Sequence, residues 1–141
     1  MINILMADDD EGDTILAREA FRGAGLEHEL FIVHDGLKAT EFLKQEGEYS
    51  AAPIPDLIFL DLNMPSMNGH EVLQWIKKQD ALKSIPVVIL TTSSTHKDIK
   101  ASYENAANCF ITKPVDLQQF REAINSTSEF WFKTAKIPSK K

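Results

Sequence analysis

The alternation of short apolar runs with amphipathic segments, repeated five times, constrains the fold of this chain more than any other feature. The first apolar run, residues 2–7, stops abruptly at three acids, Asp8 to Asp10. This is typical of a buried strand whose carboxyl end emerges into a loop. Residues 11–24 then carry apolar positions every four residues, with acids early and Gly23 and Gly25 at the end. That pattern predicts a helix.

The same unit recurs along the rest of the chain. Further strands are predicted at residues 29–33, 57–60, 87–90 and 109–112, and further helices after Asp35-Gly36, Gly69, Thr95 and Asp116. Parallel neighbours in a sheet need a helical crossover between them, and such crossovers are right-handed. The alternation therefore predicts an α/β fold, with a parallel sheet covered by helices on both faces.

Length and charge narrow the class of protein. The chain has 141 residues, the size of one domain, and no segment approaches the roughly 18 uninterrupted apolar residues of a membrane span. The amino terminus has no basic flank of a secretory signal, and the formal net charge of −6 argues against a nucleic-acid surface. We expect a cytoplasmic domain with neither DNA nor a membrane as partner, and Cys109, the single cysteine, as a reduced core thiol.

Chemically active side chains stand directly after four of the five predicted strands. Asp8 and Asp9 follow the first strand, Asp61 the third, Thr91 the fourth and Lys113 the fifth. In open parallel sheets ligands bind at the carboxyl ends of the strands, so these side chains should converge. Two carboxylates about 4 Å apart repel by roughly 4 kcal/mol, which calls for a compensating cation. An oxygen-only ligand set without His or Cys favours Mg²⁺ over zinc.

This set of groups suits phosphoryl transfer. The reaction needs an acceptor in line, with cations and donors around the equatorial oxygens of the phosphoryl group. Asp61 can be the acceptor, because carboxylates form acyl phosphates. Thr91, Lys113 and the metal would hold the oxygens.

The order and spacing of these residues resemble those of a known protein family. The motifs Asp8-Asp9, then Asp61-Leu62-Asn63-Met64-Pro65 with Gly69, then Thr91, then Lys113-Pro114 resemble the receiver domain of two-component response regulators, over about residues 2–130. The resemblance implies a flavodoxin-like, doubly wound five-stranded parallel sheet of order 2-1-3-4-5 with five helices. It also implies a response regulator that takes a phosphoryl group from a histidine kinase. Such a protein is not an ordinary enzyme, since it catalyses only its own Mg²⁺-dependent phosphorylation and dephosphorylation.

The resemblance also assigns residue roles. Asp9 is implied as the main metal carboxylate with Asp8 supporting it, and Asp61 as both phosphoacceptor and metal ligand. Asn63 would add its backbone carbonyl to the metal. Thr91 would bind the phosphoryl group and, together with Phe110, act as the switch, while Lys113 would pair with the phosphoryl group. The Lys113–Pro114 bond is expected to be cis, since a cis X-Pro bond costs only about 0.5 to 1 kcal/mol.

A closer resemblance lies in residues 108–113 and in Glu129-Phe130-Trp131. Both are similar to the single-domain receivers partnered with bacterial phytochrome-type histidine kinases, although a kinase with another stimulus stays open. The receiver domain is expected at residues 1–132, with a polar tail at 133–141. Output is expected as protein association through the fourth helix, fifth strand and fifth helix. Consecutive aromatic residues at 130–132 cannot all point inward, so a homodimer or kinase contact there competes with a monomer whose tail covers its own core.

Several assignments have structural alternatives. Asp10 is interpreted as a helix N-cap rather than a ligand, and all three acids of the first cluster could instead be helix-start acids. Lys113 could be a surface lysine, the Asn63 side chain could be turn chemistry, and Phe110 could be a static core ring. The four histidines, His28, His34, His70 and His96, are interpreted as solvated side chains.

Other function classes fit the sequence less well. A phosphatase or mutase of the Asp-x-Asp kind would need an acid where Asn63 stands. A nucleotide or flavin binder would need a glycine-rich phosphate loop, and Gly23-Ala24-Gly25 is followed by Leu26-Glu27-His28. A pseudo-receiver scaffold would lack part of the acid, threonine and lysine set, which is complete here.

Overall fold

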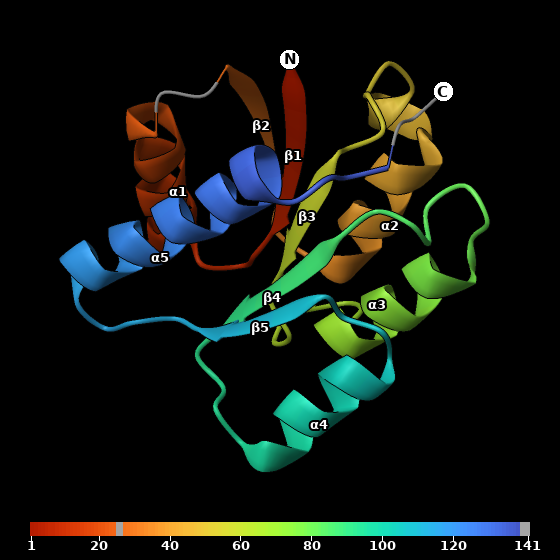
Figure 1. Ribbon diagram of the computed structural model, residues 1–141. Helices are drawn as coiled ribbons and strands as arrows, with labels where there is room; N and C mark the ends of the chain where they lie inside the picture. Colours follow the sequence, from red (N-terminus) through yellow and green to blue (C-terminus); the bar gives the residue numbers. More distant parts are fainter. Residues whose placement is uncertain (25–26, 139–141) are drawn as a thin grey trace.

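The structure, a computed structural model, describes residues 1–24 and 27–138, and its centre is a parallel five-stranded sheet (Figure 1). The strand order is β2-β1-β3-β4-β5, and all four neighbouring pairs are parallel. This confirms the predicted doubly wound topology. The strands are β1 (Ile2–Ala7), β2 (His28–Val33), β3 (Leu57–Leu60), β4 (Val87–Thr91) and β5 (Cys109–Thr112).

Five α-helices connect or follow the strands, and each begins at a polar N-cap. The cap side chain accepts a hydrogen bond from the backbone N–H three residues further on, an arrangement that stabilises a helix by about 1 kcal/mol. The predicted cap Asp10 is confirmed, and Thr95 and Asp116 are the caps of the two helices expected to begin after them. The helices are α1 (Glu11–Gly23), α2 (Gly36–Lys44), α3 (Gly69–Lys78), α4 (His96–Glu104) and α5 (Leu117–Glu129), with a short 3-10 turn at Gly47–Tyr49.

The helices form two layers around the sheet. Alternate residues of β1 point to opposite faces: Ile4 and Met6 belong to the core under α1 and α5, whereas Leu5 and Ala7 belong to the core under α2 and α3. In Figure 1, α1 and α5 cover one side of the sheet, and α2, α3 and α4 lie on the other. Strands buried on both faces explain why the predicted runs are continuously apolar rather than alternating.

The carboxyl-terminal segment is more structured than a free polar tail. A π-type helix, η2 (Phe130–Thr134), continues directly from α5, so helical structure extends past residue 132. Pro138 then lines a hollow together with Ile54 and Pro86, near the amino-terminal ends of β3 and β4. The domain limits stay a prediction, and residues 139–141 lie outside the described part. Within residues 1–24 and 27–138, no helix combines the length and apolar character needed to cross a membrane.

Candidate functional site

Backbone hydrogen bonds bring the strand ends together at one edge of the sheet. Asp61 N donates to Ala7 O at 2.9 Å, which joins the ends of β3 and β1. Asp8 N donates to Val33 O at 3.0 Å, just beyond the β1–β2 ladder. Lys113 N donates to Thr91 O at 2.7 Å, which joins the ends of β5 and β4. The predicted convergence of these strand ends is therefore present.

Lys113 is the centre of the resulting cluster. Its Nζ lies 2.6 Å from Asp8 Oδ2, 2.8 Å from Asp13 Oδ2 and 2.9 Å from Asp61 Oδ2. The side chains of Lys113, Asp8 and Asp61 are buried, whereas that of Asp13 is 23% exposed. An ammonium buried among three carboxylates is no ordinary surface lysine, so that alternative is wrong.

Burial and charge perturb both partners of the closest pair. Burial raises the pKa of Asp8 to about 6, although the Lys113 ammonium and the Asp10 backbone N–H oppose the rise. Burial of the Lys113 ammonium works against its charged form, but its bonds to Asp13 and Asp8 outweigh this and raise its pKa. The Asp8–Lys113 contact is an ion pair without hydrogen-bond geometry, which leaves Asp8 Oδ2 with no hydrogen-bond partner.

Three carboxylates at this edge fit a divalent cation. Asp8, Asp9 and Asp61 each offer an oxygen, and these oxygens lie within 4.8 Å of one another. Asp8 and Asp61 are buried and Asp9 is exposed, so the cluster opens to solvent on one side. Asp8 Oδ2 is paired with the Lys113 ammonium but accepts no hydrogen bond of good geometry, and the all-oxygen set suits a hard cation. The residues present therefore fit such an ion.

The loop after β3 is shaped by a close backbone approach. Asn63 N donates to Asp61 Oδ1 at 3.3 Å, and Gly69 N donates to Leu62 O at 2.8 Å. A Cβ on Gly69 would lie 2.2 Å from Asp61 O, so only glycine fits at the start of α3. Gly69 thus lets the first turn of α3 pack directly on the backbone of the proposed acceptor.

The two proposed switch residues lie on the neighbouring strands. Thr91 is fully buried, and its Oγ1 accepts a hydrogen bond from Ser93 N at 3.4 Å. Phe110 is half-buried and packs against the core under α2 and α3. The expectation of a cis bond between Lys113 and Pro114 is wrong, because that bond is trans. The trans isomer is the intrinsically favoured one for an X-Pro bond.

Sequence reasoning missed Asp13 and misjudged two histidines. Asp13 is the third acid that contacts Lys113. The sequence feature that could have pointed to it is its place in the first turn of the helix that follows Asp8 to Asp10. His28 and His70 are half-buried rather than solvated, whereas His34 and His96 are exposed as expected.

The misjudged His70 belongs to a polar cluster between α3 and α4. Its Nε2 lies 3.1 Å from Asp98 Oδ1, and Ser93 Oγ donates to Asp98 Oδ2. The hydrogen bonds from Ser93 and His70 lower the pKa of Asp98.

Cys109 is a half-buried free thiol whose pKa is raised by burial.

Known proteins resemble this chain along nearly its whole length. Response regulator Rcp1 of Synechocystis sp. is 43% identical over 136 residues, which span 96% of this chain and 92% of Rcp1. The crystal structure of Mn²⁺-bound Rcp1 superimposes with a TM-score of 0.94 at 42% identity, covering 99% of this chain and 100% of that one. The phosphorylated cyanobacterial phytochrome response regulator RcpA gives a TM-score of 0.95 at 44% identity, covering 98% and 99%.

The family is established by sequence as well as by fold. A sequence model described as "response regulator receiver domain" matches residues 4–125. That range includes β1 from Ile4 onward, the other four strands, and every residue of the cluster around Lys113. With the strand order, the acid cluster and these relatives taken together, the chain belongs to the response regulator receiver family.

Proposed function

We propose that this response regulator accepts a phosphoryl group on the side chain of Asp61 from the phosphohistidine of a sensor kinase. The observation that carries the proposal is the contact between Lys113 Nζ and Asp61 Oδ2 at 2.9 Å, beside the three-carboxylate cluster. An acceptor carboxylate, a fixed ammonium and a cluster able to bind a cation are the parts that phosphoryl transfer needs.

In the proposed reaction, an Asp61 carboxylate oxygen forms a bond to phosphorus while the bond from phosphorus to the kinase imidazole nitrogen breaks. The electron pair of that bond stays on the imidazole. Lys113 already touches Asp61, so its ammonium is placed to pair with a phosphoryl oxygen without further rearrangement. Dephosphorylation transfers the phosphoryl group from Asp61 to water.

We propose Mg²⁺ as the resident ion, held by Asp8, Asp9, Asp61 and the backbone carbonyl of Asn63. Asp9, the exposed acid of the cluster, is proposed as the main carboxylate and the buried Asp8 as its support. When bound, the ion supplies positive charge that neutralises the carboxylates and the transferring group. The Mn²⁺-bound form of Rcp1 supports a divalent ion here.

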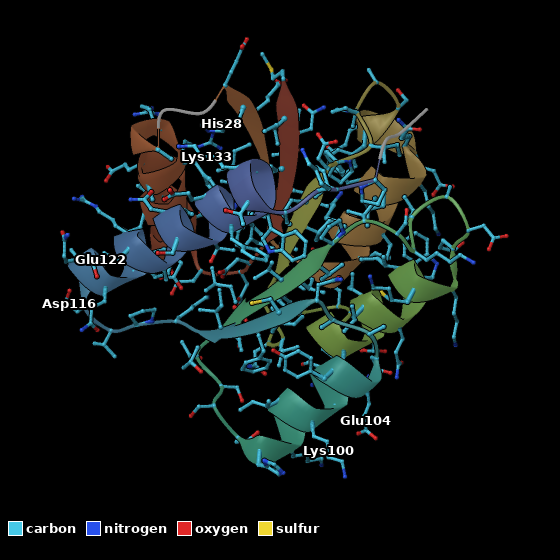
Figure 2. The ribbon with its side chains drawn as sticks, in the orientation of Figure 1. His28, Lys100, Glu104, Asp116, Glu122 and Lys133 are labelled. Carbon is cyan, nitrogen blue, oxygen red and sulfur yellow. The ribbon has the colours of Figure 1, made fainter. Side chains whose placement is uncertain are left out.

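The signal must pass from Asp61 to a surface. We propose that Thr91 binds the phosphoryl group and that Phe110 repacks in response. The output surface is proposed on α4, β5 and α5. Tyr103 on α4 and Phe130, which follows α5 in η2, are each 51% exposed. Figure 2 shows Lys100 and Glu104 on α4 pointing outward as well. Phe130 meets the expectation that at least one ring at residues 130–132 is exposed.

The partners and the cell location are further parts of the proposal. A histidine kinase is the partner that the family uses, and the phytochrome type is proposed from the name of RcpA. A homodimer through the same surface and a cytoplasmic location are further parts of the proposal. We also propose that the receiver domain comprises residues 1–132.

The test is labelling with acetyl phosphate or a phosphorylated kinase. We expect a phosphorylated species that forms with Mg²⁺ or Mn²⁺, is absent in excess EDTA, and is lost in Asp61→Asn. Asp80→Asn is the matched control, since the Asp80 side chain is 96% exposed and forms an ion pair with Lys83 at the surface. Full labelling of Asp61→Asn, or of the wild-type protein in EDTA, would refute the assignment.

A further inference from the structure

We propose that Asp13 is a positioning residue that holds the Lys113 ammonium in place for the reaction at Asp61. The inference rests on the proposed phosphoryl transfer and adds to it a residue outside the acceptor and the cation cluster. Asp13 lies in the first turn of α1, and its Oδ2 accepts a hydrogen bond from Lys113 Nζ at 2.8 Å across 100 positions of sequence.

The three acids around Lys113 are not equivalent. An ammonium has three N–H donors, and three carboxylate oxygens lie within 2.9 Å of this one. Asp8 and Asp61 also belong to the cluster whose oxygens could bind a cation, and Asp13 does not. Asp13 is therefore the acidic partner of Lys113 that a bound cation leaves unchanged.

Phosphorylation would make the difference between Asp13 and the other two acids around Lys113 larger. Once Asp61 carries the phosphoryl group, its carboxylate has become an acyl phosphate, and the donor that pointed to Asp61 is needed by a phosphoryl oxygen. Asp8, as one of the residues that would hold a cation, would at the same time share its charge between that cation and Lys113. Lys113 then keeps a fixed position only if its third donor stays on a fixed acceptor, and Asp13 is that acceptor.

The acceptor is itself held rigidly. Asp13 N donates to Oδ1 of the N-cap Asp10 at 3.1 Å, and Asp10 N donates to Asp8 Oδ1 at 2.9 Å. The start of α1 is thus tied to the end of β1, so the Asp13 carboxylate is placed by the same backbone that places Asp8. A long lysine side chain loses much rotamer freedom when it is ordered, and this connection keeps it ordered.

The test compares Asp13→Ala with Asp13→Asn. Alanine removes both charge and acceptor, whereas asparagine removes the charge and keeps an oxygen that can accept from Lys113. A hydrogen bond to a charged group contributes enough that its loss should slow labelling of Asp61 by acetyl phosphate about tenfold or more. Asp13→Asn should lose only about threefold, because it keeps the bond in its weaker, neutral form.

The matched control is Glu11→Ala. Glu11 is an exposed acid in the same first turn of α1, so its removal tests the general effect of one negative charge at this helix end. Its labelling rate should stay within about twofold of the wild-type rate. Urea unfolding of each variant verifies that it is folded under the assay conditions.

A second measurement needs neither metal nor phosphoryl donor. In ¹H–¹⁵N spectra of the metal-free protein, the Lys113 ammonium should give a signal protected from exchange with water. That signal should persist in Glu11→Ala and Asp13→Asn and vanish in Asp13→Ala. A Lys113 signal that is unchanged in Asp13→Ala would overturn the proposal. So would equal labelling rates in Asp13→Ala and the wild-type protein, or equally slow rates in Asp13→Ala and Asp13→Asn.

The two measurements separate this inference from the proposed function. If the wild-type protein is never labelled on Asp61 but its Lys113 signal depends on residue 13, the proposed reaction fails and the anchoring of Lys113 is upheld. If labelling occurs on Asp61 and neither the rate nor the signal depends on residue 13, the reaction is upheld and the role of Asp13 is refuted.

Discussion

Replacing Asp8 with asparagine is expected to stabilise the metal-free protein at neutral pH. Asp8 is 1% exposed, and burial raises its pKa from 3.8 to about 6 even with Lys113 beside it. At about 1.4 kcal/mol for each pH unit, keeping this carboxylate ionised costs the fold about 3 kcal/mol. Asparagine has nearly the same shape and no charge, so it should relieve most of that cost.

The sign of the pH dependence follows from the same shift. Because the folded-state pKa of Asp8 is higher than its unfolded value, the folded protein binds more protons between pH 3.8 and about 6. The contribution of Asp8 to the free energy of unfolding therefore falls as pH rises through this window. The stability difference between Asp8→Asn and wild type should be largest above about pH 6 and vanish near pH 4.

Urea unfolding in EDTA, followed by tryptophan fluorescence at pH 7.5, 6 and 4, measures this difference. Asp9→Asn is the control, because Asp9 is the exposed neighbour in the same cluster and its neutralisation should change stability much less. Added Mg²⁺ should stabilise the wild-type protein more than Asp8→Asn. An Asp8→Asn variant no more stable than wild type at pH 7.5 in EDTA would refute the reasoning.

Two further predictions concern the switch and the output surface. Thr91→Ala should still be phosphorylated, but its conformational response should be weak, since Thr91 is the buried hydroxyl proposed to bind the phosphoryl group. Amide NMR shifts around α4 on adding beryllofluoride measure that response. Shifts equal to those of the wild-type protein would contradict the assignment. Truncation after Ser128 removes exposed Phe130 and the half-buried rings of Trp131 and Phe132, so it should abolish a dimer seen by light scattering with beryllofluoride. A monomer in all samples, with and without beryllofluoride, would exclude the dimer.

The architecture and most of the site could be predicted from the order of the residues. Continuous apolar runs mark strands buried on both faces, and parallel topology forces their carboxyl ends to one edge, so Asp8, Asp61 and Lys113 had to converge. Helix starts were also predictable, since a cap such as Asp10 bonds to a backbone group only three residues away. These features depend on local residue patterns and on the order of strands and helices, both of which can be predicted from the sequence.

The pairing of the converging groups, in contrast, depends on the folded structure. Asp8 and Asp9 are adjacent and identical in type, yet the first is buried against Lys113 and the second faces solvent, because neighbouring residues leave a strand on opposite sides. The contact of Asp13 with Lys113 spans 100 positions and depends on where the start of α1 and the end of β5 are placed in the folded protein. Such pairings depend on how distant segments are placed relative to one another in the folded protein, which residue types and spacing do not specify.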